Sequence, residues 1–352
     1  MNGVTGADDV ELSDHLIYID ITQVCGIGCT FCMYADRHSG RQALRLDDVA
    51  RDNLARLING PGIKRVSISG EGEPLNNIPA LQDILGLARG PVRFEFITSG
   101  FLPKHKLIAV YGDIERRLAS SGSTCNIRLS SDSYHIEKIK HRPHACSVAY
   151  LLESKSRNLT LSFRSIDIDR AFTREYLIKE VQSIGLDSRI EAVSGLRDRI
   201  VLPGLALDID YKNLVDPTDD TPVGYLDLGA YITEIERSVG KDFTLGSLNR
   251  APMPNGMDIT VKPNGDVHFY GAENILLGNI HSDVLSLELL AERLRSEPFL
   301  RALHTIPLRD IFRKLSMDEA ARSVIKKTNN PYWVFKRLGK DHPHLLEQVA
   351  SP

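Results

Sequence analysis

Short apolar segments alternate with longer amphipathic segments over the first two hundred residues. Segments rich in β-branched and aromatic residues, which favour strands, lie at 15–22, 64–69, 92–98, 125–131, 158–166 and 189–193. Apolar residues recur at helical spacing at 47–59, 79–89, 103–120, 137–156 and 173–183. This alternation predicts an α/β fold with parallel strands and right-handed crossovers. Six such units are too few for a closed eight-fold barrel.

The pattern changes after Gly195. Residues 202–223 are rich in Pro, Gly and Asp and lack periodicity, and a helix is predicted at 225–239. Residues 257–269 predict a β-hairpin, because Asn-Gly at 264–265 is typical of a tight turn between strands. Helices follow at 284–295 and 298–305, with helical sequence to the end. The predicted divisions are a tail (1–14), a barrel (15–200), a connecting segment (201–256) and a small α+β C-terminal region (257–352).

Composition and charge narrow the range of functions. The 352 residues are 42% hydrophobic, which is ordinary for a globular protein. The formal charge of −3 and the pI near 6.4 give no support for nucleic acid or an anionic membrane as the main partner. The N-terminus lacks the pattern of a signal peptide, and no apolar run reaches membrane-spanning length. We therefore expect a cytoplasmic protein.

Three of the five cysteines lie in one short loop after the first predicted strand. Cys25, Cys29 and Cys32 are separated by three and then two residues, and Gly26 and Gly28 let the backbone wrap tightly. Three thiolates on one loop suit three corners of a cubane iron–sulfur cluster and leave one iron open to a small molecule. Zinc normally takes four protein ligands, and a disulfide needs an oxidising compartment. We therefore prefer a cluster to zinc, a disulfide or three unrelated thiols.

At these residues the chain resembles the radical SAM enzymes, in which a CxxxCxxC motif follows the first strand. Phe31, just before the third cysteine, matches the aromatic residue of that motif. The resemblance implies a partial TIM-like barrel of six strand–helix units, in agreement with the count above. It also implies a [4Fe-4S] cluster on the three cysteines, whose open iron is chelated by S-adenosylmethionine. With an electron donor such as flavodoxin or ferredoxin, the cofactors would yield a 5′-deoxyadenosyl radical that abstracts hydrogen from the substrate.

Further candidates lie at the carboxyl ends of the predicted strands, where functional groups of parallel barrels gather. Residues 69–75 (SGEGEPL) resemble the family's Gly-Gly-Glu-Pro segment, with Glu71 in place of its first glycine, and Glu73 is implied to bind the methionine ammonium. Arg164 is a candidate for the methionine carboxylate. An ordinary turn at 69–75 and a structural salt bridge at Arg164 remain alternatives. The full set of cofactor candidates is Phe31, Gly70, Glu71, Gly72, Glu73, Ser99, Ser130, Asp132, Arg164 and Ser194.

Other side chains are candidates for contact with the substrate. These are Tyr134, His135 and Tyr270, for each of which ordinary packing is the alternative. Residues 36–38, in a loop expected to cover the cluster, are further candidates to line the pocket. Cys125 is expected to be a small buried residue, and Cys146 to lie in a loop or helix. We expect neither thiol to donate a hydrogen atom to a product radical.

The predicted hairpin points to a family of C-terminal domains. Residues 262–267 (KPNGDV) and 277–280 (LGNI) resemble the start of the SPASM or twitch domain of some radical SAM enzymes. No cysteine follows Cys146, so the resemblance implies a version without an auxiliary cluster. This absence favours a small-molecule substrate of specialised metabolism, such as a sugar, a nucleoside or an amino-acid derivative. A peptide-modifying maturase and a non-catalytic iron–sulfur protein are the alternatives.

Overall fold

Seven neighbouring strands run parallel at the centre of one mixed sheet in the computed structural model, which describes residues 14–32, 34, 41–213, 226–245 and 256–350. Six of them pair in parallel in the order β1, β2, β3, β4, β5 and β8, and a strand of the C-terminal hairpin pairs in parallel with β1. Their bounds are β1 (His15–Asp20), β2 (Ile63–Ser69), β3 (Arg93–Thr98), β4 (Thr124–Ser130), β5 (Leu159–Ile166) and β8 (Leu205–Lys212). The sheet does not close, because β1 and β8 are bordered by further strands. The predicted α/β fold with a partial barrel of six parallel strands is confirmed.

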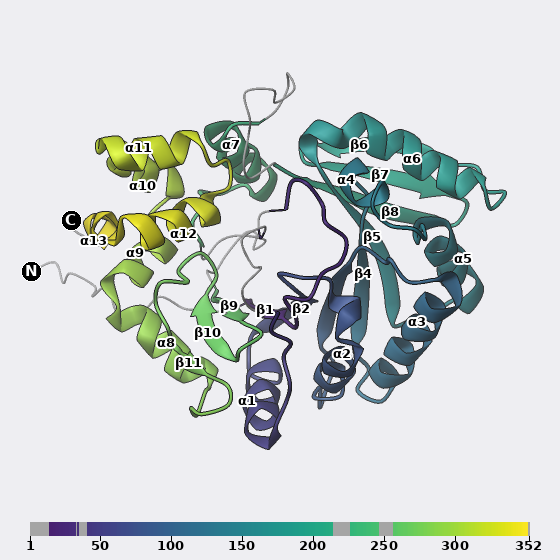
Figure 1. The fold of residues 1–352 in the computed structure, drawn as a ribbon, viewed down its shortest axis with the longest axis horizontal. Helices are drawn as coiled ribbons and strands as arrows, with labels where there is room; N and C mark the ends of the chain where they lie inside the picture. The colour runs from purple at the N-terminus through teal and green to yellow at the C-terminus, as the bar shows by residue number, and fades with distance from the viewer. Residues whose placement is uncertain (1–13, 33, 35–40, 214–225, 246–255, 351–352) are drawn as a thin grey trace, which may run out of the picture.

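Helices cover the outer face of these strands (Figure 1). They are α1 (Asp48–Ile58), α2 (Ile78–Leu85), α3 (Lys104–Ala119), α5 (His144–Ser154) and α6 (Arg170–Gln182), with the short α4 (Ser133–Ile136) after β4. The side chains of a strand alternate between faces. Ile17 and Ile19 on β1 are therefore fully buried under the helices, whereas the intervening Tyr18 and Asp20 point into the barrel. Asp47 begins α1 as an N-cap, accepting a hydrogen bond from the Ala50 amide at 2.8 Å.

The sixth parallel strand is not the one that the sequence predicts. Residues 189–193 belong to β6 (Arg189–Ser194), which runs antiparallel to β7 (Arg197–Leu202) at the edge of the sheet. The chain then reverses at Gly204, whose φ of +75° suits glycine, and β8 returns to pair in parallel with β5. The prediction read Pro203-Gly204 as part of a long loop. In fact buried residues alternate on both sides of this turn, at Ile200, Leu202, Leu207, Ile209 and Tyr211.

The predicted hairpin forms and extends the same sheet. Strands β9 (Asp258–Val261) and β10 (Asp266–Phe269) pair in antiparallel register, and β11 (Gly278–Asn279) lies at the edge. Gly265 in the turn has a φ of +90°, which explains the Asn-Gly sequence. Strand β9 also pairs in parallel with β1, in the register Ile17↔Ile259. The C-terminal hairpin is thereby joined by hydrogen bonds to the first strand of the barrel.

The remaining helices gather on the side of the sheet where β9, β10 and β11 lie (Figure 1). They are α7 (Leu228–Val239), α8 (Leu287–Ser296), α9 (Pro298–Thr305), α10 (Leu308–Leu315), α11 (Glu319–Lys326), α12 (Pro331–Asp341) and α13 (Pro343–Ala350). Their packed faces include the fully buried Leu300, Phe335 and Leu338. Within the described ranges, we find no helix with the length and apolar character needed to span a membrane.

Asn53 on α1 ties the barrel to the C-terminal region. Its buried amide donates hydrogen bonds to the carbonyls of Ile280 and Asp283, at 2.8 and 2.7 Å, and its oxygen accepts one from the Leu285 amide at 3.0 Å. We expect Asn53→Ala to lower the free energy of unfolding by about 3 kcal/mol, because buried backbone groups lose their partners. Urea denaturation measures the change.

The matched control for this variant is Gln182→Ala on the exposed side of α6. A surface substitution of this kind changes the free energy of unfolding by about 0.5 kcal/mol or less. If Asn53→Ala is no more destabilising than Gln182→Ala, these three hydrogen bonds do not hold the C-terminal region to α1.

Candidate active site at the carboxyl ends of the strands

The cysteine loop leaves β1 at the carboxyl edge of the sheet. Cys25, Cys29 and Cys32 are all partly exposed. Gly28 lies between them with a φ of +72°, a conformation that other residues rarely adopt. Cys125 contrasts with them, because it is fully buried on β4 and its burial raises the pKa of its thiol. Three partly exposed cysteines thus lie on one glycine-containing loop.

The geometry of these thiols bears on what they can hold. Among the residues that the structure describes, no three metal-binding side chains converge on a single point. Zinc normally takes four protein ligands, whereas a cubane cluster can take three thiolates at separate corners, each on its own iron. The chemistry of three thiolates on one loop therefore fits a cluster better than a single zinc ion.

Segment 70–73 packs directly on the chain that leads into the cysteine loop. The Gly72 amide donates to the Thr22 carbonyl and the Glu73 amide to the Val24 carbonyl, both at 2.9 Å. A Cβ on Gly70 would lie 2.7 Å from the Thr22 carbonyl oxygen, and one on Gly72 would collide with that of Val24. Both positions therefore require glycine for a contact with the protein's own backbone. The sequence indicated only close approach to a ligand.

Glu73 is bound by its own chain. Its carboxylate, 3% exposed, accepts hydrogen bonds from the Thr98 hydroxyl at 2.5 Å and from the Ser99 hydroxyl and amide at 2.6 and 2.8 Å. A fourth bond comes from the Leu75 amide at 3.0 Å. The structure thus brings the predicted residues Glu73 and Ser99 together. These contacts hold the ends of β2 and β3 in place and occupy both carboxylate oxygens.

Lys262, at the end of β9, is a site residue that sequence reasoning missed. Its ammonium lies 3.3 Å from Asp20, 3.1 Å from Glu71 and 3.0 Å from Glu273. The side chain is only 12% exposed, so these charges meet where water screens them little. Glu71, at the place of the family's first glycine, is thus neutralised by a lysine of the C-terminal hairpin. The sequence indicates that Lys262 follows directly on a predicted strand. It does not indicate that this strand, β9, pairs with β1, which is what brings Lys262 to the site.

Asp20 is the second residue that sequence reasoning missed. It ends β1 and is 1% exposed, and its Oδ1 has no hydrogen-bond partner within the described part of the chain. Burial raises the pKa of Asp20 to about 6, although Lys262 opposes this increase. Burial alone lowers the pKa of Lys262, but the surrounding carboxylates raise it above its ordinary value. Lys262 therefore stays charged. The electrostatic cost of placing several carboxylates close together appears as the raised pKa of Asp20.

The candidates after β4 form an aromatic cluster around Phe31. Tyr134 and His135 place their rings 4.8 and 5.5 Å from the Phe31 ring. Asp132 caps α4 and accepts a hydrogen bond from His135 Nδ1 at 2.8 Å, and the imidazole also bonds to Cys29. Burial lowers the pKa of His135, but Asp132 and Cys29 together raise it to about 10. These residues contact the cysteine loop itself.

Tyr270 lies apart from that cluster. Its ring packs 4.3 Å from Tyr332 of α12 and 6.0 Å from Tyr18 of β1. Trp333 of α12 also contacts Tyr34, which follows the cysteine loop, at 5.4 Å. Helix α12 therefore lies against the mouth of the barrel. The predicted pocket residues 36–38 fall outside the described residues.

Arg164 and Ser194 have different positions in the fold. Arg164 is half-buried on the inner face of β5, next to Ser130 of β4, and its side chain makes no hydrogen bond or ion pair with any described residue. Within the described part of the chain, the alternative of a structural salt bridge therefore finds no partner. Ser194 ends the edge strand β6, so its prediction as a residue at the end of the sixth parallel strand is wrong. That place belongs to Lys212 at the end of β8.

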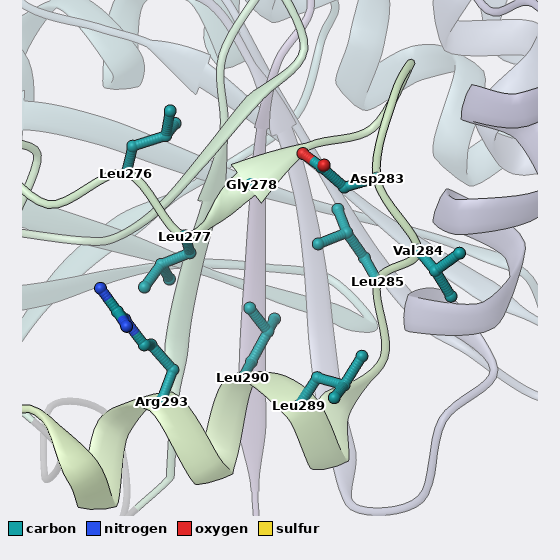
Figure 2. Close-up of a pocket in the computed structure, with 9 residues that line it drawn as sticks. All are labelled: Leu276, Leu277, Gly278, Asp283, Val284, Leu285, Leu289, Leu290 and Arg293. Atoms are coloured by element: carbon teal, nitrogen blue, oxygen red, sulfur yellow. The ribbon is translucent and has the colours of Figure 1, made fainter.

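A surface hollow lies elsewhere on the molecule. It has a volume of about 440 Å³ and lies between β11 and α8, three strands away from β1 (Figure 2). Leucines such as Leu277 and Leu290 point into it, with Arg293 and Asp283 at its ends. It contains no cysteine and none of the predicted site residues. The candidate site therefore remains at the carboxyl ends of the strands.

Comparisons with known proteins agree with this fold. No family model matches the chain. A probable dual-specificity RNA methyltransferase RlmN of Akkermansia muciniphila is 29% identical over 131 residues, 35% of this chain and 36% of that protein. The corresponding protein of Acholeplasma laidlawii is 29% identical over 151 residues, 40% of this chain and 44% of that protein. The chain thus matches less than half the length of these curated relatives.

A solved structure covers nearly the whole chain. The structure of anSMEcpe with bound AdoMet (S-adenosylmethionine) and the Cp18Cys peptide has a TM-score of 0.51 and 14% identity, over 95% of this chain and 98% of that chain. At this identity the likeness concerns the fold. Together with the sequence relatives and the three-cysteine loop, this likeness supports the resemblance of the chain to the radical SAM enzymes. Enzymes of this superfamily use a [4Fe-4S] cluster and S-adenosylmethionine.

The network around Lys262 leads to a stability prediction. We expect Lys262→Met to lower the free energy of unfolding by about 3–5 kcal/mol, because three neighbouring carboxylates lose their shared cation. The double variant Lys262→Met/Glu71→Gly removes one of these carboxylates and should recover part of the loss. Denaturation of the protein without cofactors measures both changes.

Lys336→Met is the control, because Lys336 contacts Glu273 at 3.0 Å from a more exposed position. It should cost about 1 kcal/mol or less. Equal losses in the single Lys262→Met variant and the double variant would show that Lys262 does not act by neutralising Glu71.

Proposed function

We propose that Cys25, Cys29 and Cys32 hold a [4Fe-4S] cluster and that the protein is a radical SAM enzyme acting on a small molecule. The observation that carries this proposal is the position of three partly exposed cysteines on one loop at the carboxyl edge of a parallel sheet. Segment 70–73 is hydrogen-bonded to the chain just before them. When bound together, the cluster and S-adenosylmethionine supply a hydrogen-abstracting organic radical.

The protein's own residues then bind and orient the cofactor. Arg164 presents an unpaired guanidinium fork to the barrel mouth and takes the methionine carboxylate in this proposal. The methionine ammonium lies against segment 70–73. Since the Glu73 carboxylate already accepts four hydrogen bonds, the ammonium either shares it with Ser99 or uses the backbone of this segment. Ser130, beside Arg164, lies within the same set of strand ends.

Aromatic side chains on two sides restrict access of water. The cluster of Phe31, Tyr134 and His135 covers the cysteine loop from the β4 side. Tyr332 and Trp333 of α12 pack on residues of the mouth from the other side. A site that generates a reactive radical needs such shielding, because exclusion of water and other molecules prevents side reactions.

The covered mouth favours a small molecule, such as a sugar, nucleoside or amino-acid derivative, in specialised metabolism. A peptide is the second candidate, because the structure of anSMEcpe that matches 95% of this chain contains a bound Cp18Cys peptide. RNA is less favoured. The RlmN relatives match only 35–40% of this chain, and its formal charge of −3 does not favour a nucleic-acid partner.

Alanine in place of Cys25, Cys29 or Cys32 should abolish cluster binding. Each variant removes one of three thiolates, so anaerobic reconstitution should give little iron, no brown absorbance and no 5′-deoxyadenosine after dithionite and S-adenosylmethionine are added. Cys146→Ala is the control, because Cys146 is buried on α5 and its thiol hydrogen-bonds the Pro143 carbonyl. It should keep the iron content and activity of the wild type.

Two results would contradict the proposal. A wild-type protein that holds zinc instead of iron would exclude the cluster. A wild-type protein with an intact cluster that yields no 5′-deoxyadenosine would be a non-catalytic iron–sulfur protein.

The role of Arg164 can be tested with a cofactor analogue. We expect Arg164→Gln to weaken S-adenosylmethionine about tenfold, or 1.4 kcal/mol, through loss of a charge-assisted bond to the carboxylate. Binding of decarboxylated S-adenosylmethionine should not change, since this analogue lacks the carboxylate. Calorimetric titration of the reconstituted protein measures both affinities. Arg199→Gln, which alters a partly exposed pair with Asp208, is the control, and equal losses for both ligands would argue against the carboxylate role.

A further inference from the structure

Lys212 is a second cation at the barrel mouth for which the described residues provide no ion pair. It is the last residue of β8 and shares the inner face with Arg164, because Asp210 pairs with Arg164 and side chains two apart on a strand share a face. Its ammonium lies 5.7 Å from the centre of the Phe31 ring, close to the cysteine loop. The side chain is half-buried and has no ion pair or hydrogen bond with any residue that the structure describes.

The carboxylates near Lys212 are already engaged by other groups. Asp132 binds His135 at 2.8 Å, and Asp210 binds Arg197 at 2.7 Å. Glu95 deeper in the barrel binds Arg128 at 3.2 Å. The inner face at the ends of β5 and β8 therefore has two cations whose neighbouring acids are taken.

This arrangement is costly for the protein alone. Burial and the charge of Arg164 lower the pKa of Lys212 to about 8, because both disfavour a charged ammonium. The Phe31 ring compensates only in part, since 5.7 Å is near the outer limit of a cation–π contact. An anionic group at this point would meet two cations in a partly dry environment, where charge-assisted hydrogen bonds are strong.

We propose that Lys212 binds an anionic group, a carboxylate or a phosphate, of the enzyme's substrate. This assignment rests on the proposed function, in which S-adenosylmethionine brings a single carboxylate and Arg164 takes it. The Cys32 thiolate also lies near Lys212, but in the proposed function the cluster takes that thiolate. A second cation beside Arg164 then suits a second anion, and the substrate is the remaining molecule in the site. The substrate class is thereby restricted to acidic metabolites, such as a sugar phosphate, a nucleotide or a compound with a free carboxylate.

The test uses inorganic phosphate as the probe and the reconstituted protein loaded with S-adenosylmethionine. The affinity for phosphate is measured by calorimetry for the wild type, Lys212→Met, Lys212→Arg and Lys326→Met. Lys326 is exposed on α11, so Lys326→Met changes the net charge equally without touching the site. We expect Lys212→Met to bind phosphate at least tenfold more weakly, and Lys212→Arg and Lys326→Met to bind as the wild type does.

A second measurement separates the two sources of an anion. The affinities of Lys212→Met for S-adenosylmethionine and its decarboxylated analogue should both equal those of the wild type. Phosphate binding unchanged in Lys212→Met, or absent from the wild type, would overturn the proposal. So would a loss of affinity for S-adenosylmethionine but not for the analogue, because Lys212 would then serve the cofactor's carboxylate. Failure of the proposed function itself shows separately, as a wild type without a cluster or without 5′-deoxyadenosine.

Discussion

The parallel pairing of β1 with β2 on one side and β9 on the other is the constraint on which the site depends. It brings three segments to one edge of the sheet: the cysteine loop after β1, segment 70–73 after β2, and Lys262 after β9. Parallel strands end at the same edge, so each contributes its first loop residues to one region. The backbone hydrogen bonds of Gly72 and Glu73 to residues 22 and 24 then join two of these loops directly.

Two groups of charges on the inner face differ in whether the protein itself supplies their partners. On the β1 side, Lys262 balances Asp20, Glu71 and Glu273 within the protein. On the β5 and β8 side, Arg164 and Lys212 have no acidic partner among the described residues. Buried charges are costly unless they are paired. The first group therefore stabilises the site without a ligand, whereas the second would gain a partner if an anion bound there, as we propose.

The C-terminal region contributes to the sheet and to the mouth of the barrel. Hairpin β9–β10 continues the sheet, Asn53 holds residues 280–285 against α1, and α12 packs on Tyr34 and Tyr270. Removal of the hairpin would leave both Glu71 and Asp20 without their common cation. A protein with a glycine at position 71 would need this cation less.

Local patterns in the sequence determined most of the parallel strands, the helices that follow them, the hairpin at 257–269 and the three-cysteine loop. Each of these depends on periodicity, capping or spacing within a few residues of chain. The sixth parallel strand is β8 and not the segment 189–193 that the sequence predicts. The Pro, Gly and Asp residues of 202–223 favour a loop, whereas buried residues alternate along the strands on both sides of Pro203-Gly204. Only the tertiary structure decided which strands are neighbours, and therefore that Lys262 meets Glu71 and that Lys212 stands beside Arg164. These pairs are separated by 191 residues and by 48 residues, and no local signal relates the charges that pairing of distant strands brings together.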